Sequence, residues 1–134
     1  MNKPTYIIDG KKFKTLEEFY NEISQILSPP SWWGRNLDAF NDILRPDFMP
    51  EQGYIIIWKN SHLSRQFLGY EETTRQLSKQ LEKCHPDNIP SLQKKLAEAK
   101  QHIGTTVFDW LVEIIRDHCP GGREEDDKGE LLLE

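Results

Sequence analysis

The sequence predicts an α/β fold in which a small parallel sheet packs against helices. Three short apolar segments, at 6–9, 53–58 and 131–133, have the composition of buried strands. Segments with helical spacing of their apolar residues lie between them, and the clearest are 15–27 and 105–118. Strands that alternate with helices are typical of βαβ units, in which the crossover helix makes neighbouring strands parallel.

The first strand and the first helix have clear predicted boundaries. The segment TYIIDG is expected to form a strand from Tyr6 to Asp9 that ends in a turn at Gly10. Thr15 is the predicted N-cap of the helix, because a glutamate follows it three residues later, as in a capping box. The helix then runs to about Leu27 and stops before two prolines. Its apolar stripe comprises Leu16, Phe19, Ile23, Ile26 and Leu27.

A second, short helix and the clearest strand of the chain follow. Asn36 is the predicted N-cap of a helix from Leu37 to about Leu44, which Pro46 closes. The segment GYIIIW (53–58) contains three consecutive isoleucines without alternation of apolar and polar residues. This pattern predicts a central strand that is buried on both faces.

Residues 60–104 differ in composition from the rest of the chain. Two helical patterns, LGYEETTRQLSKQLEKC and SLQKKLAEAKQHI, are rich in Lys, Gln and Glu and poor in large apolar residues. Pro86 and Pro90 stand between them, so we expect a peripheral helical hairpin. The following segment, 105–118, is strongly amphipathic, and an acidic loop at 123–130 leads to the last strand.

Composition limits the possible functions. A chain of 134 residues is long enough for a single domain with one core. The net charge of −5 argues against general binding of nucleic acid and is compatible with a basic protein partner. No apolar run reaches the length of a membrane helix, and the N-terminus lacks the apolar centre of a signal peptide. We therefore expect a cytoplasmic protein that makes no membrane contact.

Neither a metal site nor an enzyme active site is predicted. Cys84 and Cys119 could form one bridge, but two free thiols are expected in a cytosolic chain. Each cysteine adjoins a histidine, and adjacent residues cannot easily turn both side chains toward one ion. No pattern supports nucleophilic catalysis, and no phosphate loop or dinucleotide fingerprint is present, so no cofactor is expected. The four histidines, expected on the surface or at helix ends, are His62, His85, His102 and His118.

The stretch PPSWWGRNLDAF (29–40) is the most unusual in the chain. It places two adjacent tryptophans beside a turn and directly before the second helix. On a helical wheel of residues 37–44, Asp38 and Asp42 lie almost opposite the apolar side, one turn apart. One interpretation is a solvated acidic face, with Asp38 favoured in the first turn by the helix dipole. The other is an interface hot spot, because a rigid aromatic loop and paired carboxylates suit a cationic partner.

The residues PSWWGRNLDAFNDIL resemble the signature of the barstar family, small intracellular inhibitors of secreted bacterial ribonucleases. The family pattern has a proline, two aromatics, Gly, a variable residue, Asn-Leu-Asp-Ala and an acidic residue three positions further on. The matching positions are Pro30, Trp32, Trp33, Gly34, Asn36, Leu37, Asp38, Ala39 and Asp42. The IDG before the first helix, the YIIIW strand and the last helix and strand match in the same order. The resemblance therefore covers about 5–68 and 105–134.

The resemblance implies a barstar-like fold, with a three-stranded parallel sheet packed against helices. It implies a single domain over 1–134 with a helical insertion at about 69–104. It also implies an inhibitor, rather than an enzyme, that occludes the basic active site of an extracellular, barnase-like ribonuclease in a 1:1 complex. The helix carboxylates would take the place of the RNA phosphates, without direct contact with nucleic acid and without a metal or cofactor.

The resemblance also assigns roles to individual residues. Asp42 would accept charge-assisted hydrogen bonds from Arg, Lys or His groups at the centre of the enzyme's site, and Asp38 would pair at its rim. Trp32 would stack on a catalytic histidine or on the base-binding surface. Gly34 and Asn36 would shape the loop. The complete partner-binding set is Trp32, Trp33, Gly34, Asn36, Asp38, Asn41, Asp42 and Asp109, the last being a further acidic contact on the final helix.

Three departures from the family pattern leave the target open. Arg35 puts a positive charge in the loop, where it would repel a basic enzyme that lacks an acid opposite to it. Asn41 stands where an aromatic contact is common, and the segment at 69–104 has no counterpart in the pattern. The alternatives are a different toxin nuclease as target, or a protein-interaction module that keeps the fold without binding a ribonuclease.

Overall fold

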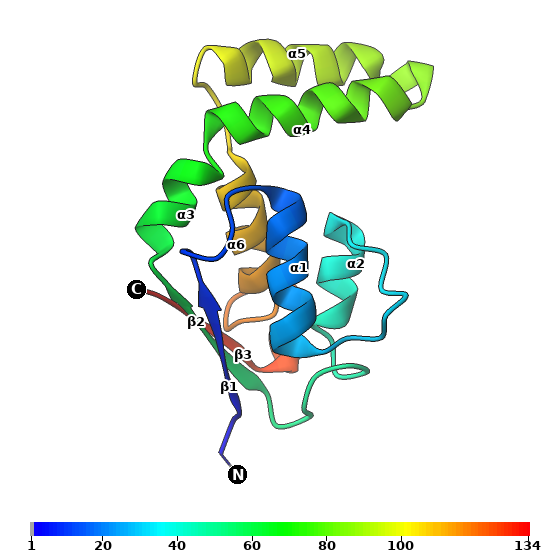
Figure 1. Ribbon diagram of the computed structural model, residues 1–134. Helices are drawn as coiled ribbons and strands as arrows, with labels where there is room; N and C mark the ends of the chain where they lie inside the picture. The colour runs from blue at the N-terminus through cyan, green and yellow to red at the C-terminus, as the bar shows by residue number, and fades with distance from the viewer. Residues whose placement is uncertain (1) are drawn as a thin grey trace.

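The computed structural model describes residues 2–134 and contains one three-stranded sheet (Figure 1). Its strands are β1 (Thr5–Asp9), β2 (Tyr54–Lys59) and β3 (Gly129–Leu133). They lie in the order β1-β2-β3, and both pairs are parallel. The predicted α/β class and the three-stranded parallel sheet are therefore confirmed.

In the described part of the chain, six α-helices lie between the strands. They are α1 (Leu16–Leu27), α2 (Leu37–Ile43), α3 (Ser61–Phe67), α4 (Tyr70–Lys83), α5 (Ile89–Lys100) and α6 (Val107–Asp117), and two 3₁₀ turns lie at Pro86–Asn88 and Glu125–Asp127. Helices α1, α2 and α6 pack together on one face of the sheet (Figure 1). Within residues 2–134, no helix is both long enough and apolar enough to cross a membrane.

The helices begin where the sequence places their caps. The Thr15 hydroxyl accepts a hydrogen bond from the Glu18 amide at 3.2 Å, and the Asn36 side chain accepts one from the Ala39 amide at 2.8 Å. Each bond satisfies one of the amides that the first turn of a helix leaves without a partner. Both predicted starts, and both ends to within one residue, are confirmed.

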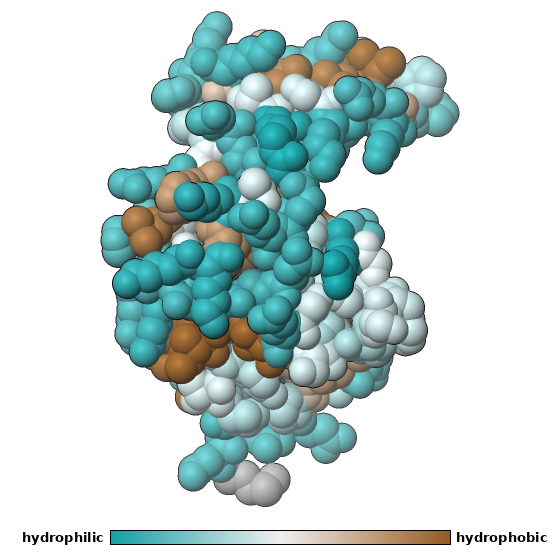
Figure 2. Space-filling model, in the orientation of Figure 1, coloured by the Kyte–Doolittle hydropathy of each residue, from teal (hydrophilic) through white to brown (hydrophobic). Residues whose placement is uncertain are grey.

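Only one face of the central strand is fully buried, so the prediction that β2 is buried on both faces is wrong. Its side chains alternate between the core and a half-buried surface row. In that row, Ile57 pairs with Ile7 on one side and with Leu132 on the other, and these neighbours are 46% and 50% exposed. The three helices that cover the sheet all pack on the opposite face. Figure 2 shows the resulting hydrophobic patch over the strands.

Helices α4 and α5 form a hairpin that projects from the rest of the molecule (Figure 1), as the composition of this segment predicts. One detail differs. Helix α5 begins at Ile89, so Pro90 lies in its first turn rather than between the helices. Proline is tolerated there because the first amides of a helix have no acceptor in any case.

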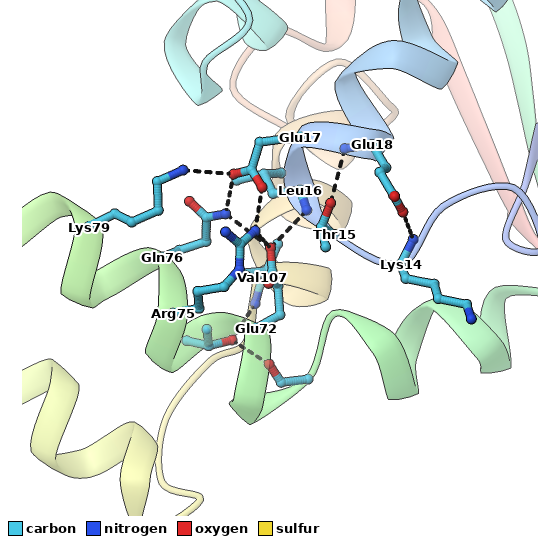
Figure 3. A network of polar contacts seen from close by, with 12 residues as sticks. Lys14, Thr15, Leu16, Glu17, Glu18, Glu72, Arg75, Gln76, Lys79 and Val107 are labelled. Carbon is cyan, nitrogen blue, oxygen red and sulfur yellow. Dashed lines mark hydrogen bonds and ion pairs between the residues drawn. The ribbon is translucent and has the colours of Figure 1, made fainter.

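Buried side chains of α4 anchor this hairpin (Figure 3). Glu72 is only 5% exposed, and its carboxylate accepts a hydrogen bond from the Leu16 amide at the start of α1, at 2.8 Å. The hydroxyl of Thr73 accepts one from the Val107 amide at the start of α6, at 2.9 Å. Helix α4 thus supplies capping acceptors to two helices of the main body, and this fixes its position.

A second, more exposed set of contacts surrounds Glu17 (Figure 3). Its carboxylate pairs with Arg75 and accepts hydrogen bonds from Gln76 at 2.6 Å and Lys79 at 3.2 Å. Burial raises the pKa of the Glu17 carboxyl, but the three donors outweigh burial and lower this pKa from 4.5 to about 2. The ionised carboxylate therefore contributes to the attachment of α4 to α1.

This pKa shift predicts how acid weakens the protein. Because the folded-state pKa lies below the ordinary value, the contribution of Glu17 is complete above about pH 4.5 and is lost as the pH falls toward 2. We expect Glu17→Gln to lower the free energy of unfolding at pH 7, and the difference from the wild type to shrink steadily below pH 4.5. Urea unfolding at pH 7, 4 and 3 measures this. Glu71→Gln, at an exposed position of α4, is the control. If the free energy of unfolding had the same pH dependence in both variants, the acid-sensitive contribution would not come from the Glu17 carboxylate.

Candidate functional site

The loop between α1 and α2 makes a tight turn that depends on left-handed backbone. Gly34 and Arg35 have φ values of +85° and +50°. A glycine adopts this conformation without a steric penalty, which explains Gly34 in the motif. The Arg35 guanidinium donates a hydrogen bond to the Asn21 side chain on α1 at 2.7 Å. The positive charge in this loop is therefore directed back toward α1.

The two adjacent tryptophans have different surroundings. Trp33 is 4% exposed, its indole N–H donates to the Ser24 hydroxyl at 2.9 Å, and its ring packs edge-on against Tyr20. Trp32 is 74% exposed. The sequence prediction placed both in the partner-binding set, but the Trp33 side chain belongs to the core. It holds the loop that presents Trp32, and its own contact with a partner stays a prediction.

Trp32 has an aromatic neighbour that the sequence analysis missed. The ring of Phe48 lies edge-on to Trp32, with 6.4 Å between ring centroids, and Phe48 is 40% exposed. Beside this pair is a hollow of about 380 Å³, whose lining includes Trp32, Gly34, Asp42, Arg45 and Phe48. A single phenylalanine after a proline carries no periodic signal, so only its packing identifies it.

Helix α2 presents its two aspartates as the helical wheel predicts. Phe40 and Ile43 are buried against the core, and Asp38 and Asp42 are exposed on the other side. Since Asn36 caps this helix and the core holds its inner face, the positions of the two carboxylates are set by the fold. Trp32 and Asp42 line the same hollow, so the aromatic loop and the acidic face form one continuous surface.

Asp42 is held by an arginine one turn further on. Arg45 lies 3.2 Å from the Asp42 carboxylate, donates a hydrogen bond from Nε to Glu124 at 3.0 Å, and approaches the same Glu124 oxygen to 2.8 Å with a second nitrogen as an ion pair. The hydrogen bond to Glu124 and the charge of that carboxylate raise the pKa of the Arg45 guanidinium, which therefore stays charged. The Asp42 side chain remains 57% exposed. Arg45 thus restricts the orientation of Asp42 and leaves most of its carboxylate accessible.

A buried histidine lies beneath this surface. His118 is expected at the surface or at a helix end; it does cap the end of α6, but it is 0% exposed. Its Nδ1 lies 2.6 Å from an Asp127 oxygen and 3.3 Å from a Glu124 oxygen, and its Nε2 lies 2.8 Å from the Asn41 side-chain oxygen. Asn41, predicted to contact a partner, is therefore tied to the C-terminal segment from within.

Three of these side chains could in principle ligate a metal ion. The donor atoms of His118, Glu124 and Asp127 lie within 4.8 Å of one another. However, Nδ1 and the Asp127 oxygen are at hydrogen-bond distance, 2.6 Å, whereas two ligands of a tetrahedral zinc ion are about 3.3 Å apart. Arg45 also neutralises Glu124. The geometry is that of a hydrogen bond between His118 and Asp127 beside an Arg45–Glu124 ion pair.

Asp109 has a structural task at the start of α6. Its carboxylate accepts hydrogen bonds from the Thr106 amide at 2.9 Å and the Thr106 hydroxyl at 3.1 Å, which completes a capping box. The predicted contact with a partner would compete with these bonds. Cys84 and Cys119 are both free, as expected for this chain.

Comparisons with known proteins show which family the chain is similar to. A protein of Bacillus subtilis (strain 168) named "Putative ribonuclease inhibitor YrdF" is 35% identical over 63 residues, which are 47% of this chain and 67% of that protein. The family model described as "Barstar (barnase inhibitor)" matches residues 4–133. Because that match spans nearly the whole chain, the chain belongs to the barstar family.

Proposed function

We propose that this protein inhibits a ribonuclease by covering its basic active site with the exposed face of α2 and with Trp32. The observation that carries this proposal is the pair of exposed carboxylates, Asp38 and Asp42, on a capped helix beside a tryptophan that is 74% exposed. A site that cleaves RNA must attract phosphates, so two fixed carboxylates can compete for the same cationic groups. The expected complex is 1:1, without nucleic acid, metal or cofactor.

The electrostatics of the chain favour such a partner. A net charge of −5 attracts a basic enzyme over long range and accelerates encounter, an effect for which barstar complexes are a standard example. In the complex, Asp42 takes the central position and Asp38 the rim. Arg45 holds Asp42 before binding, so less side-chain entropy is lost when the enzyme's cations reach it.

The remaining predicted residues act mainly as supports in this proposal. Trp33 and Gly34 shape the loop, Asn36 caps α2, and Asn41 connects α2 to His118. Asp109 contributes only when the partner draws it from its capping box. Two positive groups near the surface, Arg35 and Arg45, favour a target that carries acids opposite to them. A toxin nuclease other than barnase is therefore the second candidate.

Removing the central carboxylate tests the proposal. Calorimetric titration of the wild type with barnase is expected to give tight 1:1 binding that weakens with added salt. Asp42→Ala should weaken it by about 30-fold or more, the threshold of an interface hot spot. Asp87→Ala, which removes an exposed carboxylate at the far end of the hairpin, is the matched control and should change affinity little. Equal affinity of both variants would contradict the assignment of the site to α2.

The two tryptophans provide a second test, because one is exposed and the other buried. Trp32→Ala should weaken barnase binding while changing the free energy of unfolding by less than about 0.5 kcal/mol. Trp33→Ala should instead lower the free energy of unfolding by about 3–5 kcal/mol. Chemical denaturation and calorimetry on the same two variants separate the effects. A large loss of stability in Trp32→Ala would contradict its role as a free contact residue.

A further inference from the structure

The α4–α5 hairpin has a pocket at its junction with the main body. The pocket has a volume of about 410 Å³, and its apolar lining consists of Leu37, Leu77, Ala99, Ile103 and Trp110. These side chains come from α2, α4, α5, the loop after α5, and α6. Ile103 is 52% exposed, although it is a large apolar residue. Hydrophobic side chains that gather around an open pocket are a common mark of a binding surface.

This pocket is continuous with the proposed ribonuclease-binding face. Leu37, the first residue of α2, lines it and also lines a neighbouring hollow of about 770 Å³ that contains Asn36 and Asp38. Gln80 of α4 also lines both the pocket and this neighbouring hollow. The third hollow, at Trp32 and Asp42, contains residues from the other end of α2. The acidic face of α2 therefore lies between the aromatic loop and the hairpin.

The hairpin is held firmly enough to serve as part of such a surface. Glu72 and Thr73 fix the start of α4 to the main body through buried hydrogen bonds. The Tyr70 hydroxyl donates to the Gly104 carbonyl at 2.6 Å, and its ring stacks on His102, with centroids 4.9 Å apart. Both ends of the hairpin are thus tied to the same place. A surface that is already ordered loses little entropy when a partner binds.

The charges of the hairpin indicate which side chains it would receive. Residues 70–104 carry six basic and five acidic side chains, so this segment adds almost nothing to the negative field of the protein. In the hollow beside Asp38, Glu17 is already paired with Lys79, and Arg35 with Asn21. Lys95 and Glu98, the two charged residues of the pocket lining, have opposite signs, so the hairpin offers mainly apolar contact there, while α2 offers the negative charge.

We propose that the base of the hairpin, where it meets the main body, is a second contact region for the inhibited ribonuclease, and that its pocket receives an apolar side chain of the enzyme at the edge of the basic active site. This inference rests on the function proposed above. It assigns a task to the α4–α5 hairpin: it enlarges the surface buried around α2 and adds a hydrophobic anchor, the kind of contact from which interfaces derive much of their affinity.

The experiment compares two variants that change the net charge equally. Ile103→Glu places a carboxylate at the mouth of the pocket, and Gln93→Glu places one at an exposed position of α5 outside the pocket lining. With barnase as the probe, we expect Ile103→Glu to weaken binding about tenfold, mainly through faster dissociation. Gln93→Glu should stay within about twofold of the wild type. Melting temperatures recorded for both variants check that the fold is intact.

Amide hydrogen exchange of the wild type with barnase gives a second measurement that needs no mutation. Protection at residues 77–80 and 99–105, in addition to α2, is expected. The inference is overturned if Asp42→Ala loses affinity while Ile103→Glu retains it and these residues stay unprotected; the proposed function then stands. It is also overturned if Ile103→Glu only abolishes self-association of the chain, measured by sedimentation. If the wild type does not bind barnase, the proposed function fails and this inference fails with it.

Discussion

The structure depends on a cluster of buried aromatic rings that joins the sheet to the helices on its covered face. Trp58 of β2 stacks on Phe19 of α1, with centroids 5.5 Å apart, and contacts Phe108 of α6 edge-on at 5.2 Å. Phe19 in turn meets Phe40 of α2 at 5.3 Å. Because one residue from each element enters the same cluster, none of the three helices can rotate without opening a cavity. The exposed direction of α2, and with it Asp38 and Asp42, follows from this packing.

The candidate site is consequently assembled from distant parts of the chain, although its motif is local. Asp42 is reached by Arg45, which is held by Glu124 from the segment before the last strand. One ring nitrogen of His118 contacts Asp127 in the same segment, and the other contacts Asn41 on α2. These contacts fix the geometry of the Asp42 carboxylate although it stays exposed. The free-energy cost of removing water from this carboxylate would therefore arise only on binding, when the charge of a cationic partner can offset it.

The hairpin shows how a polar helical segment can be attached firmly to the main body of the molecule. Its helices bury few large apolar side chains, and its attachment relies instead on acceptors that the main body lacks at the starts of α1 and α6. Buried, fully bonded polar groups specify one geometry more sharply than apolar contact does, because any displacement leaves amides without partners. This geometry places the pocket at the base of the hairpin next to the hollow that contains Asp38.

Much of this protein could be predicted from the sequence, because the deciding interactions are local. The caps at Thr15 and Asn36, the opposite faces of α2 and the polar hairpin all depend on residues within a few positions of one another. Other features were decided by contacts across the fold: burial of Trp33 but not Trp32, the open face of β2, and the cluster around His118. Periodicity reports which face of a helix or strand is apolar, but not which neighbour covers it. That choice depends on long-range packing, in which residues 77 positions apart in the chain, Asn41 and His118, come within hydrogen-bond distance.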